Sequence, residues 1–204
     1  MAKVCGLTSA GDVALALDAG ADLLGFLAFP ASPRHCPDLG LARRCADRAV
    51  LVAVAGDAET MLALARRAGT LWVQPYLPPP ERARALALLR VDGRRVLLPW
   101  PDEPGQEELA PDLYLWESSP RATGLLGGSG QGHPMAFPPP GPFLLGGGLD
   151  GAAVPERLER MTAPVRARLR GFDAASRLES APGRKDPLAL AAFVGTAHGL
   201  PGAP

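Results

Sequence analysis

Lys3-Val4-Cys5-Gly6-Leu7-Thr8 is a short apolar strand that ends in a cysteine followed by a glycine. In a parallel barrel, side chains at the carboxyl ends of strands face the active site, and the loops that follow complete it. The sequence therefore places Cys5 at the mouth of strand one, with Ser9 as the N-cap of the first helix. Taken alone, Cys5 has a simpler interpretation as a small buried hydrophobic residue.

Short apolar runs alternate with helical stretches along the rest of the chain. The pattern predicts strands over residues 2–5, 23–27, 50–55, 71–74, 95–98, 113–116, 143–145 and 165–174. It predicts helices over residues 11–19, 39–47, 58–68, 80–89, 154–161 and 187–197. Alternating strands and helices imply parallel strands joined by right-handed crossovers.

The number of predicted strands, eight, is that of a (β/α)₈ TIM barrel, and we expect a single α/β domain over residues 1–204. Prolines in the second half, among them Pro101, Pro104 and Pro111, predict short or degenerate helices there. The alternative is a doubly wound open sheet. That fold would normally show a glycine-rich dinucleotide loop after strand one, which Cys5-Gly6-Leu7-Thr8 is not.

Composition narrows the partners and the location. The 204 residues carry no formal net charge and contain no apolar run of the roughly 18 residues that a membrane helix needs, so neither nucleic acid nor a membrane is expected as a partner. Cys5, Cys36 and Cys45 have no CxxC spacing, and no signal peptide is evident. We therefore expect a cytoplasmic protein with a small-molecule ligand.

Two glycine clusters and a third segment follow the late strands. Gly127-Gly128-Ser129-Gly130 follows strand six, Gly146-Gly147-Gly148 follows strand seven, and residues 176–179 follow strand eight. Glycines let backbone N–H groups approach an anion closely, and barrels often bind phosphate between the loops after strands seven and eight. Each cluster alone could be a flexible loop, but together they predict a phosphate site that includes Gly128, Ser129, Gly130, Gly147, Gly148 and Ser176.

Two charged residues stand out near predicted strand ends. Arg34 follows strand two and could clamp a carboxylate with two parallel N–H bonds, although a solvated loop arginine is the simpler interpretation. Glu117 comes directly after Leu113-Tyr114-Leu115-Trp116 and would lie at the mouth of strand six, or else in a surface turn. The three histidines show no metal-ligand spacing, so no metal is predicted.

Together, these segments resemble the phosphoribosylanthranilate isomerase family of tryptophan biosynthesis. The matching segments cover the chain from end to end: 3–8, 20–26, 32–34, 127–130, 145–149, 176–179 and 182–186. The resemblance implies an Amadori rearrangement of an aminoaldose phosphate to an aminoketose phosphate without a cofactor. It also implies that Cys5 is the general base and that Arg34 faces the anthranilate. The family's general acid is an aspartate, and Glu117 stands at its position.

Several residues depart from the family pattern in the predicted pocket. They are Trp116-Glu117 for leucine-aspartate, Gln74-Pro75-Tyr76-Leu77 for Gln-Leu-His-Gly, Gln131 for lysine, Arg177 for glycine, and Ala55-Gly56-Asp57 without the usual phenylalanine. These departures favour a divergent family member, and they leave open a catalytically weak or repurposed phosphate-binding barrel. A Schiff-base aldolase would need a lysine in the mouth, for which only Lys3 and Lys185 are available. We expect a monomer or a homodimer.

Overall fold

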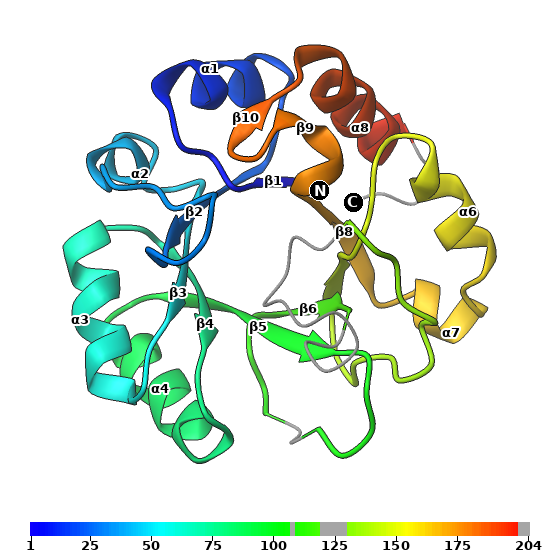
Figure 1. Cartoon of the computed structure of the whole chain (residues 1–204). Coiled ribbons are helices and arrows are strands. Elements are labelled where there is room, and N and C mark those ends of the chain that lie inside the picture. Colours follow the sequence, from blue (N-terminus) through cyan, green and yellow to red (C-terminus); the bar gives the residue numbers. More distant parts are fainter. Residues whose placement is uncertain (107–108, 119–129, 200–204) are drawn as a thin grey trace.

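A computed structural model describes residues 1–106, 109–118 and 130–199. Eight parallel strands form a closed barrel in sequence order, with each strand hydrogen-bonded to its neighbours and β8 paired with β1 (Figure 1). The strands are β1 Ala2–Cys5, β2 Leu23–Ala28, β3 Ala49–Val54, β4 Trp72–Tyr76, β5 Arg95–Pro101, β6 Leu113–Glu117, β7 Phe143–Leu145 and β8 Leu169–Ala174. The (β/α)₈ prediction is confirmed.

Helices surround the barrel, and the two between β7 and β8 are short, whereas the last helix, α8, is as long as α4 (Figure 1). They are α1 Ala10–Asp18, α2 Gly40–Arg44, α3 Ala58–Ala68, α4 Pro79–Val91, α6 Ala153–Glu159, α7 Ala163–Arg166 and α8 Pro187–Gly199. No helix is found in the described residues between β5 and β6, where Pro104 and Pro111 interrupt the chain. The expected short helices of the second half are thus present.

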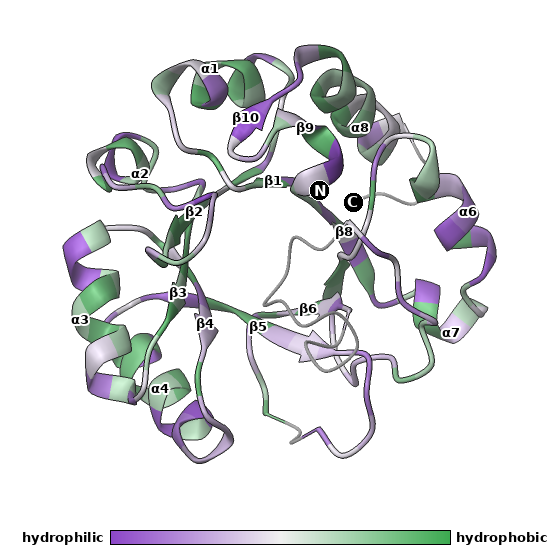
Figure 2. Cartoon of the chain, viewed as in Figure 1, coloured by the Kyte–Doolittle hydropathy of each residue, from purple (hydrophilic) through white to green (hydrophobic). Residues whose placement is uncertain are grey.

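Two layers of apolar side chains hold the barrel together. Alternation along each strand sends one set inward, as with Leu113 and Leu115 of β6, and the other set outward against the helices, as with Tyr114 and Trp116. Figure 2 shows both hydrophilic and hydrophobic residues on the surrounding helices, as expected of helices that cover a sheet on one side only. This alternation decides which strand-end residues face the mouth.

Two predicted elements have wrong boundaries, and one further element was not predicted. The last strand begins at Leu169 instead of residue 165, because residues 163–166 form α7 with Pro164 in its first turn. The helix predicted over 39–47 covers only Gly40–Arg44 and is followed by a turn. After β8, a 3₁₀ turn (η1, Ser176–Leu178) leads into an antiparallel hairpin that the sequence did not predict, formed by β9 Glu179–Ala181 and β10 Arg184–Lys185.

Candidate active site

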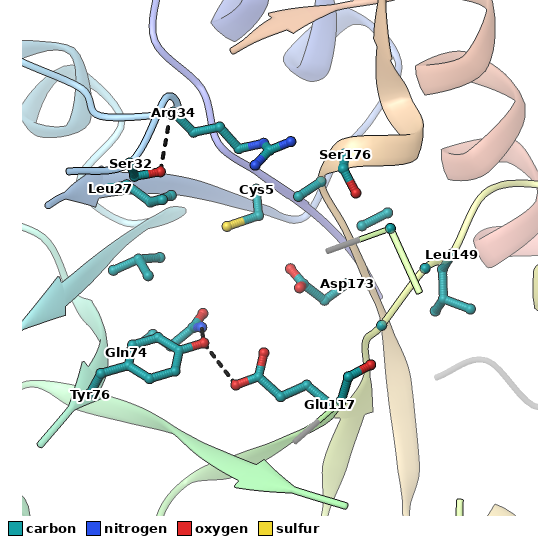
Figure 3. A pocket seen from close by; sticks show the side chains of 17 residues that line it. Cys5, Leu27, Ser32, Arg34, Gln74, Tyr76, Glu117, Leu149, Asp173 and Ser176 are labelled. Atoms are coloured by element: carbon teal, nitrogen blue, oxygen red, sulfur yellow. Dashed lines mark hydrogen bonds between the residues drawn. The ribbon is translucent and has the colours of Figure 1, made fainter. Parts of the chain in front are cut away.

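The carboxyl ends of the strands surround one pocket at the mouth of the barrel (Figure 3). Seven of the nine predicted site residues line it: Cys5, Arg34, Glu117, Gly130, Gly147, Gly148 and Ser176. The other two, Gly128 and Ser129, lie outside the described residues. The pocket also contains residues that the prediction did not assign to the site: Gln74, Tyr76, Ser118 and Asp173.

Cys5 ends β1 and points into the pocket (Figure 3). Its neighbour across the strand pair is Gly25, where a Cβ atom would lie 2.7 Å from the Cys5 sulfur, so glycine is needed to make room for the thiol. Burial raises the pKa of the Cys5 thiol, and the cation of Lys3 only partly opposes that effect. The lowered pKa that a thiolate base requires is therefore not found at Cys5.

Lys3 lies two residues before Cys5 on the same inward face of β1. Its Nζ donates to Oδ1 of Asp173 on β8 at 2.6 Å, and the lysine side chain is fully buried. Burial alone would lower the pKa of Lys3, but Asp173 and Cys5 together raise it above the ordinary value. Lys3 is thus a cation at neutral pH, whereas a Schiff-base lysine must lose its proton to attack a carbonyl.

Glu117 ends β6 and faces inward, because it continues the alternation of Leu113 and Leu115. Only 6% of its surface is exposed, and Oε1 accepts a hydrogen bond from the Tyr76 hydroxyl at 2.8 Å. Burial raises the pKa of Glu117 to about 7, and the nearby Asp173 adds to the rise. The carboxyl group is therefore partly protonated near neutrality, as a general acid must be.

Trp116 does not shape the pocket. The bulky ring points outward, packs edge-on against Phe143 with ring centroids 5.5 Å apart, and donates its indole N–H to Asp102 at 3.1 Å. The sequence analysis left open a surface turn for Glu117, and its burial in the mouth overturns that alternative.

Arg34 lines the pocket from the loop after β2, but its hydrogen-bonding fork is already occupied. Nε and Nη2 each lie 2.9 Å from a carboxylate oxygen of Glu179, which begins β9. Lys185 Nζ bonds the same carboxylate at 3.0 Å and also donates to the Cys5 carbonyl oxygen at 2.6 Å. Arg34 therefore clamps a carboxylate with two parallel N–H bonds, as the sequence suggested it could, and that carboxylate belongs to Glu179.

The loops after β6, β7 and β8 converge on the opposite side of the pocket. A Cβ atom on Gly148 would lie 2.7 Å from the Gly130 carbonyl oxygen, and one on Gly130 would lie 3.4 Å from Ser176 Oγ. Arg177 joins the same loops by donating to the Gly130 carbonyl oxygen at 3.1 Å and to Asp150 at 3.2 Å. Backbone groups of three loops thus lie close to one another and to a cation.

The described part of the chain shows neither a cluster of metal-binding side chains nor a helix that could span a membrane. No cluster of three or more histidine, cysteine or acidic residues is arranged to hold a metal ion there. Among the described helices, none has the length and apolar character needed to cross a membrane.

Known proteins are similar in sequence to this chain along nearly its whole length. An N-(5′-phosphoribosyl)anthranilate isomerase of Azorhizobium caulinodans is 36% identical over 94% of this chain and 89% of its own. A protein of the same name from Rhodopseudomonas palustris is 32% identical over 96% of this chain and 97% of its own.

This chain belongs to the phosphoribosylanthranilate isomerase family. The crystal structure of the phosphoribosyl anthranilate isomerase of Thermus thermophilus superposes with a TM-score of 0.74 at 26% identity, and the alignment covers 96% of each chain. No family model matches the sequence. In this family member, the pocket at the barrel mouth is therefore the candidate active site.

Two pocket residues that the sequence analysis missed, Asp173 and Tyr76, could have been recognised from their positions in the sequence. Asp173 and Tyr76 are the last inward-facing residues of β8 and β4, so a place at the carboxyl end of a strand, the signal that identified Glu117, could also have found them. Tyr76 stood out only as a departure from the family motif.

Proposed function

We propose that this chain isomerises N-(5′-phosphoribosyl)anthranilate to 1-(2-carboxyphenylamino)-1-deoxyribulose 5-phosphate. The observation that carries the proposal is the presence of Cys5 and Glu117 in one pocket beside Gly130, Gly147, Gly148 and Ser176. The family supplies the reaction, and the pocket supplies a base, an acid and an anion site for it. The catalytic and binding roles below are part of the proposal.

The phosphate occupies the side of the pocket formed by Gly130, Gly147, Gly148 and Ser176. Backbone N–H groups near positive-φ glycines can point at one anion, and Gly130, Gly147 and Gly148 have φ values of 71°, 87° and 62°. Arg177 adds positive charge at the rim, where it already links two of these loops. Binding energy from the phosphate then positions the sugar carbons without taking part in the chemistry.

The chemistry requires two proton transfers. Protonated Glu117 gives its proton to the furanose ring oxygen as the C1–O bond breaks, and the aniline nitrogen lone pair forms the C1=N iminium. The Cys5 thiolate then removes the proton from C2, and the C2–H electron pair neutralises the iminium to give an enolamine. Tautomerisation of the enolamine gives the aminoketose, so no electrons are exchanged with a cofactor.

The aryl end of the substrate lies toward Arg34. Its guanidinium is held in place by Glu179, so it offers a flat cationic face against which an aromatic ring can stack. The Gln74 Oε1 is buried without a partner in the described part of the structure, and it lines the same pocket. It can accept a hydrogen bond from a sugar hydroxyl.

A direct assay tests the proposal. Purified protein should convert the substrate to the aminoketose phosphate, identified by chromatography, and the gene should restore growth to a tryptophan auxotroph that lacks this isomerase. Absence of both activities would favour the alternative of a repurposed phosphate-binding barrel. A cytoplasmic location, a single domain and a monomeric or homodimeric state stay predictions.

A further inference from the structure

The Tyr76 side chain contacts Glu117 directly. It ends β4, its hydroxyl lies 2.8 Å from Glu117 Oε1, and both residues belong to the wall of the active-site pocket (Figure 3). The contact joins side chains that are 41 positions apart in the sequence and come from strands that are not neighbours in the barrel. The reaction as described uses Glu117 but gives Tyr76 no role.

The direction of this hydrogen bond is fixed by Gln74. The Gln74 Nε2 group donates to the Tyr76 oxygen at 2.9 Å, so the single hydroxyl hydrogen of Tyr76 is left to point at Glu117. Oε1 of Glu117 is then an acceptor. A proton on the carboxyl group must sit on the other oxygen, Oε2, if this hydrogen bond is to be kept.

A second cavity next to the active-site pocket could accept the Glu117 carboxyl group. Strands β4 and β5 pair only at Trp72 with Arg95 and at Val73 with Val96, whereas β5 and β6 are joined by five such pairs. Pro75 and Pro99 have no N–H with which to extend the ladder. Beyond the last pair is a largely apolar cavity of about 310 Å³, and Tyr76 and Glu117 line both this cavity and the active-site pocket.

We propose that Tyr76 is a positioning residue for Glu117. Its hydroxyl holds the carboxyl group at the active-site pocket instead of letting it turn into the second cavity, and it leaves Oε2 to carry the proton that opens the sugar ring. The proposal rests on the proposed function, because it assigns Glu117 the role of acid.

Some groups around Glu117 raise its pKa and others lower it. Burial and Asp173 raise its pKa, while the Tyr76 hydroxyl and the Lys3 cation lower it, with a result of about 7. The Cys5 thiol also lies in the same pocket, and the Arg82 guanidinium lines the second cavity. Removing only the Tyr76 hydroxyl therefore removes one stabilising contact of the carboxylate and leaves the charged groups in place.

The test is Tyr76→Phe, with Tyr114→Phe as the matched control. Tyr114 faces outward from β6 and donates its hydroxyl to the Leu109 carbonyl oxygen, away from the pocket. At pH 6 the Glu117 carboxyl group is protonated in the wild-type chain and in Tyr76→Phe, so a lower kcat there reports position and not protonation. We expect kcat at pH 6 to fall about tenfold in Tyr76→Phe and to stay within twofold in Tyr114→Phe.

A titration without substrate provides the second readout. The Glu117 carboxyl carbon, labelled with ¹³C and assigned with Glu117→Gln, should titrate about one pH unit higher in Tyr76→Phe than in the wild-type chain. A structural role alone would not move this value. An unshifted titration together with an unchanged kcat at pH 6 would overturn the proposal.

A double variant and the activity of the wild-type chain complete the test. Glu117→Asp withdraws the carboxyl group by about 1.5 Å, beyond reach of Tyr76, so adding Tyr76→Phe to it should cost no further activity. A further tenfold loss in that double variant, with its melting temperature unchanged from that of Glu117→Asp, would contradict the pairing. An inactive wild-type chain would overturn the proposed function, whereas the titration tests the Tyr76 contact in either case.

Discussion

Lys3 Nζ lies 2.6 Å from Asp173 Oδ1, and this ion pair joins the first and last strands of the barrel in the same mouth as Cys5. The Lys3 side chain is fully buried and that of Asp173 is 13% exposed. Two charges removed from water are costly to separate, because the remaining partner is left unpaired. Asp173 thus lines the pocket, and its ion pair with Lys3 adds a side-chain contact to the backbone pairing of β1 with β8.

Lys3→Met should destabilise the chain by about 3 kcal/mol, because it leaves the Asp173 carboxylate without its partner. Urea unfolding at pH 7 measures this loss. The double variant Lys3→Met/Asp173→Leu should recover most of it, since no unpaired charge remains. A double variant as unstable as Lys3→Met would show that packing, and not the unpaired carboxylate, is responsible.

Cys5→Ser should lower turnover by about 100-fold or more, because a serine hydroxyl is far too weakly acidic to act as the base. Cys45→Ser is the matched control. Cys45 is half-buried beyond the end of α2, where its thiol donates to the Leu41 carbonyl oxygen outside the pocket. Single-turnover rates and melting temperatures on both variants separate the roles, and a normal rate in Cys5→Ser would refute the catalytic one.

Gly148→Ala should abolish binding of a sugar phosphate. Its Cβ atom would lie 2.7 Å from the Gly130 carbonyl oxygen, at a φ of 62° that side chains rarely adopt. Ribulose 5-phosphate at a hundredfold excess over its Kd should stabilise the wild-type chain by about 2–3 kcal/mol, seen as a rise in melting temperature.

Gly93→Ala is the control for backbone strain in that experiment. Gly93 has a similar φ of 74°, but a Cβ atom added there would meet nothing within 4 Å, and the residue sits in the turn between α4 and β5. The variant should melt at a lower temperature yet keep the full ligand-induced rise. A ligand-induced rise that persists in Gly148→Ala would place the phosphate elsewhere.

The sequence was a sufficient guide to the barrel because parallel strands buried on both faces form continuous apolar runs between turn residues. It was insufficient where local signals conflict. Residues 163–166 contain Val165 amid helix-compatible neighbours, and only Pro164 at the helix start distinguishes α7 from the strand that follows. The hairpin of β9 and β10 is short and polar, and contacts such as that of Lys185 with Glu179 hold it in place.

At the site, the sequence motifs identified individual residues but could not predict which side chains they would pair with. Arg34 was identified correctly as a pocket residue, yet its ion pair with Glu179 joins side chains 145 positions apart, which no local pattern reveals. The same holds for Tyr76 and Glu117. Pair geometry, and with it the direction of each pKa shift, arises only when the strands close into a barrel.

Glu117→Gln should stabilise the chain at pH 8. The folded-state pKa of about 7 lies above the ordinary value of 4.5, so between these values the folded chain binds more protons than the unfolded chain. The stability that this proton provides is complete below about pH 4.5 and is lost as the pH rises through 7. Glutamine does not ionise, so the variant avoids a loss of about 3 kcal/mol.

Urea unfolding at pH 8 and pH 4.5 tests this sign. Glu117→Gln should exceed the wild-type chain in stability at pH 8 and match it at pH 4.5, while turnover falls about 100-fold. Glu156→Gln, at an exposed position of α6, is the control and should change stability little at either pH. A Glu117→Gln variant less stable than the wild-type chain at pH 8 would contradict burial as the cause of the raised pKa.

The pH dependence of kcat/KM should show that most molecules carry the proton on Cys5 and not on Glu117, which is the less reactive form. Catalysis needs Glu117 protonated and Cys5 ionised, yet burial raises the pKa of the thiol above its ordinary value of about 8.5, while the pKa of Glu117 is about 7. The reactive form is then a minor one, and the two pKa values belong to the coupled pair.

The product of the two fractions fixes the shape of the profile. Below pH 7 the carboxyl group stays protonated and the thiolate fraction rises with pH, so kcat/KM should increase up to about pH 7. From there to the thiol pKa the gain in thiolate is offset by the loss of protonated Glu117, which gives a plateau, and above the thiol pKa the rate falls. In Glu117→Gln the residual activity should instead keep rising past pH 7 until the thiol pKa is reached. A wild-type rate that declines near pH 7 would show that Cys5 ionises before Glu117, and that the Lys3 cation outweighs burial at the thiol.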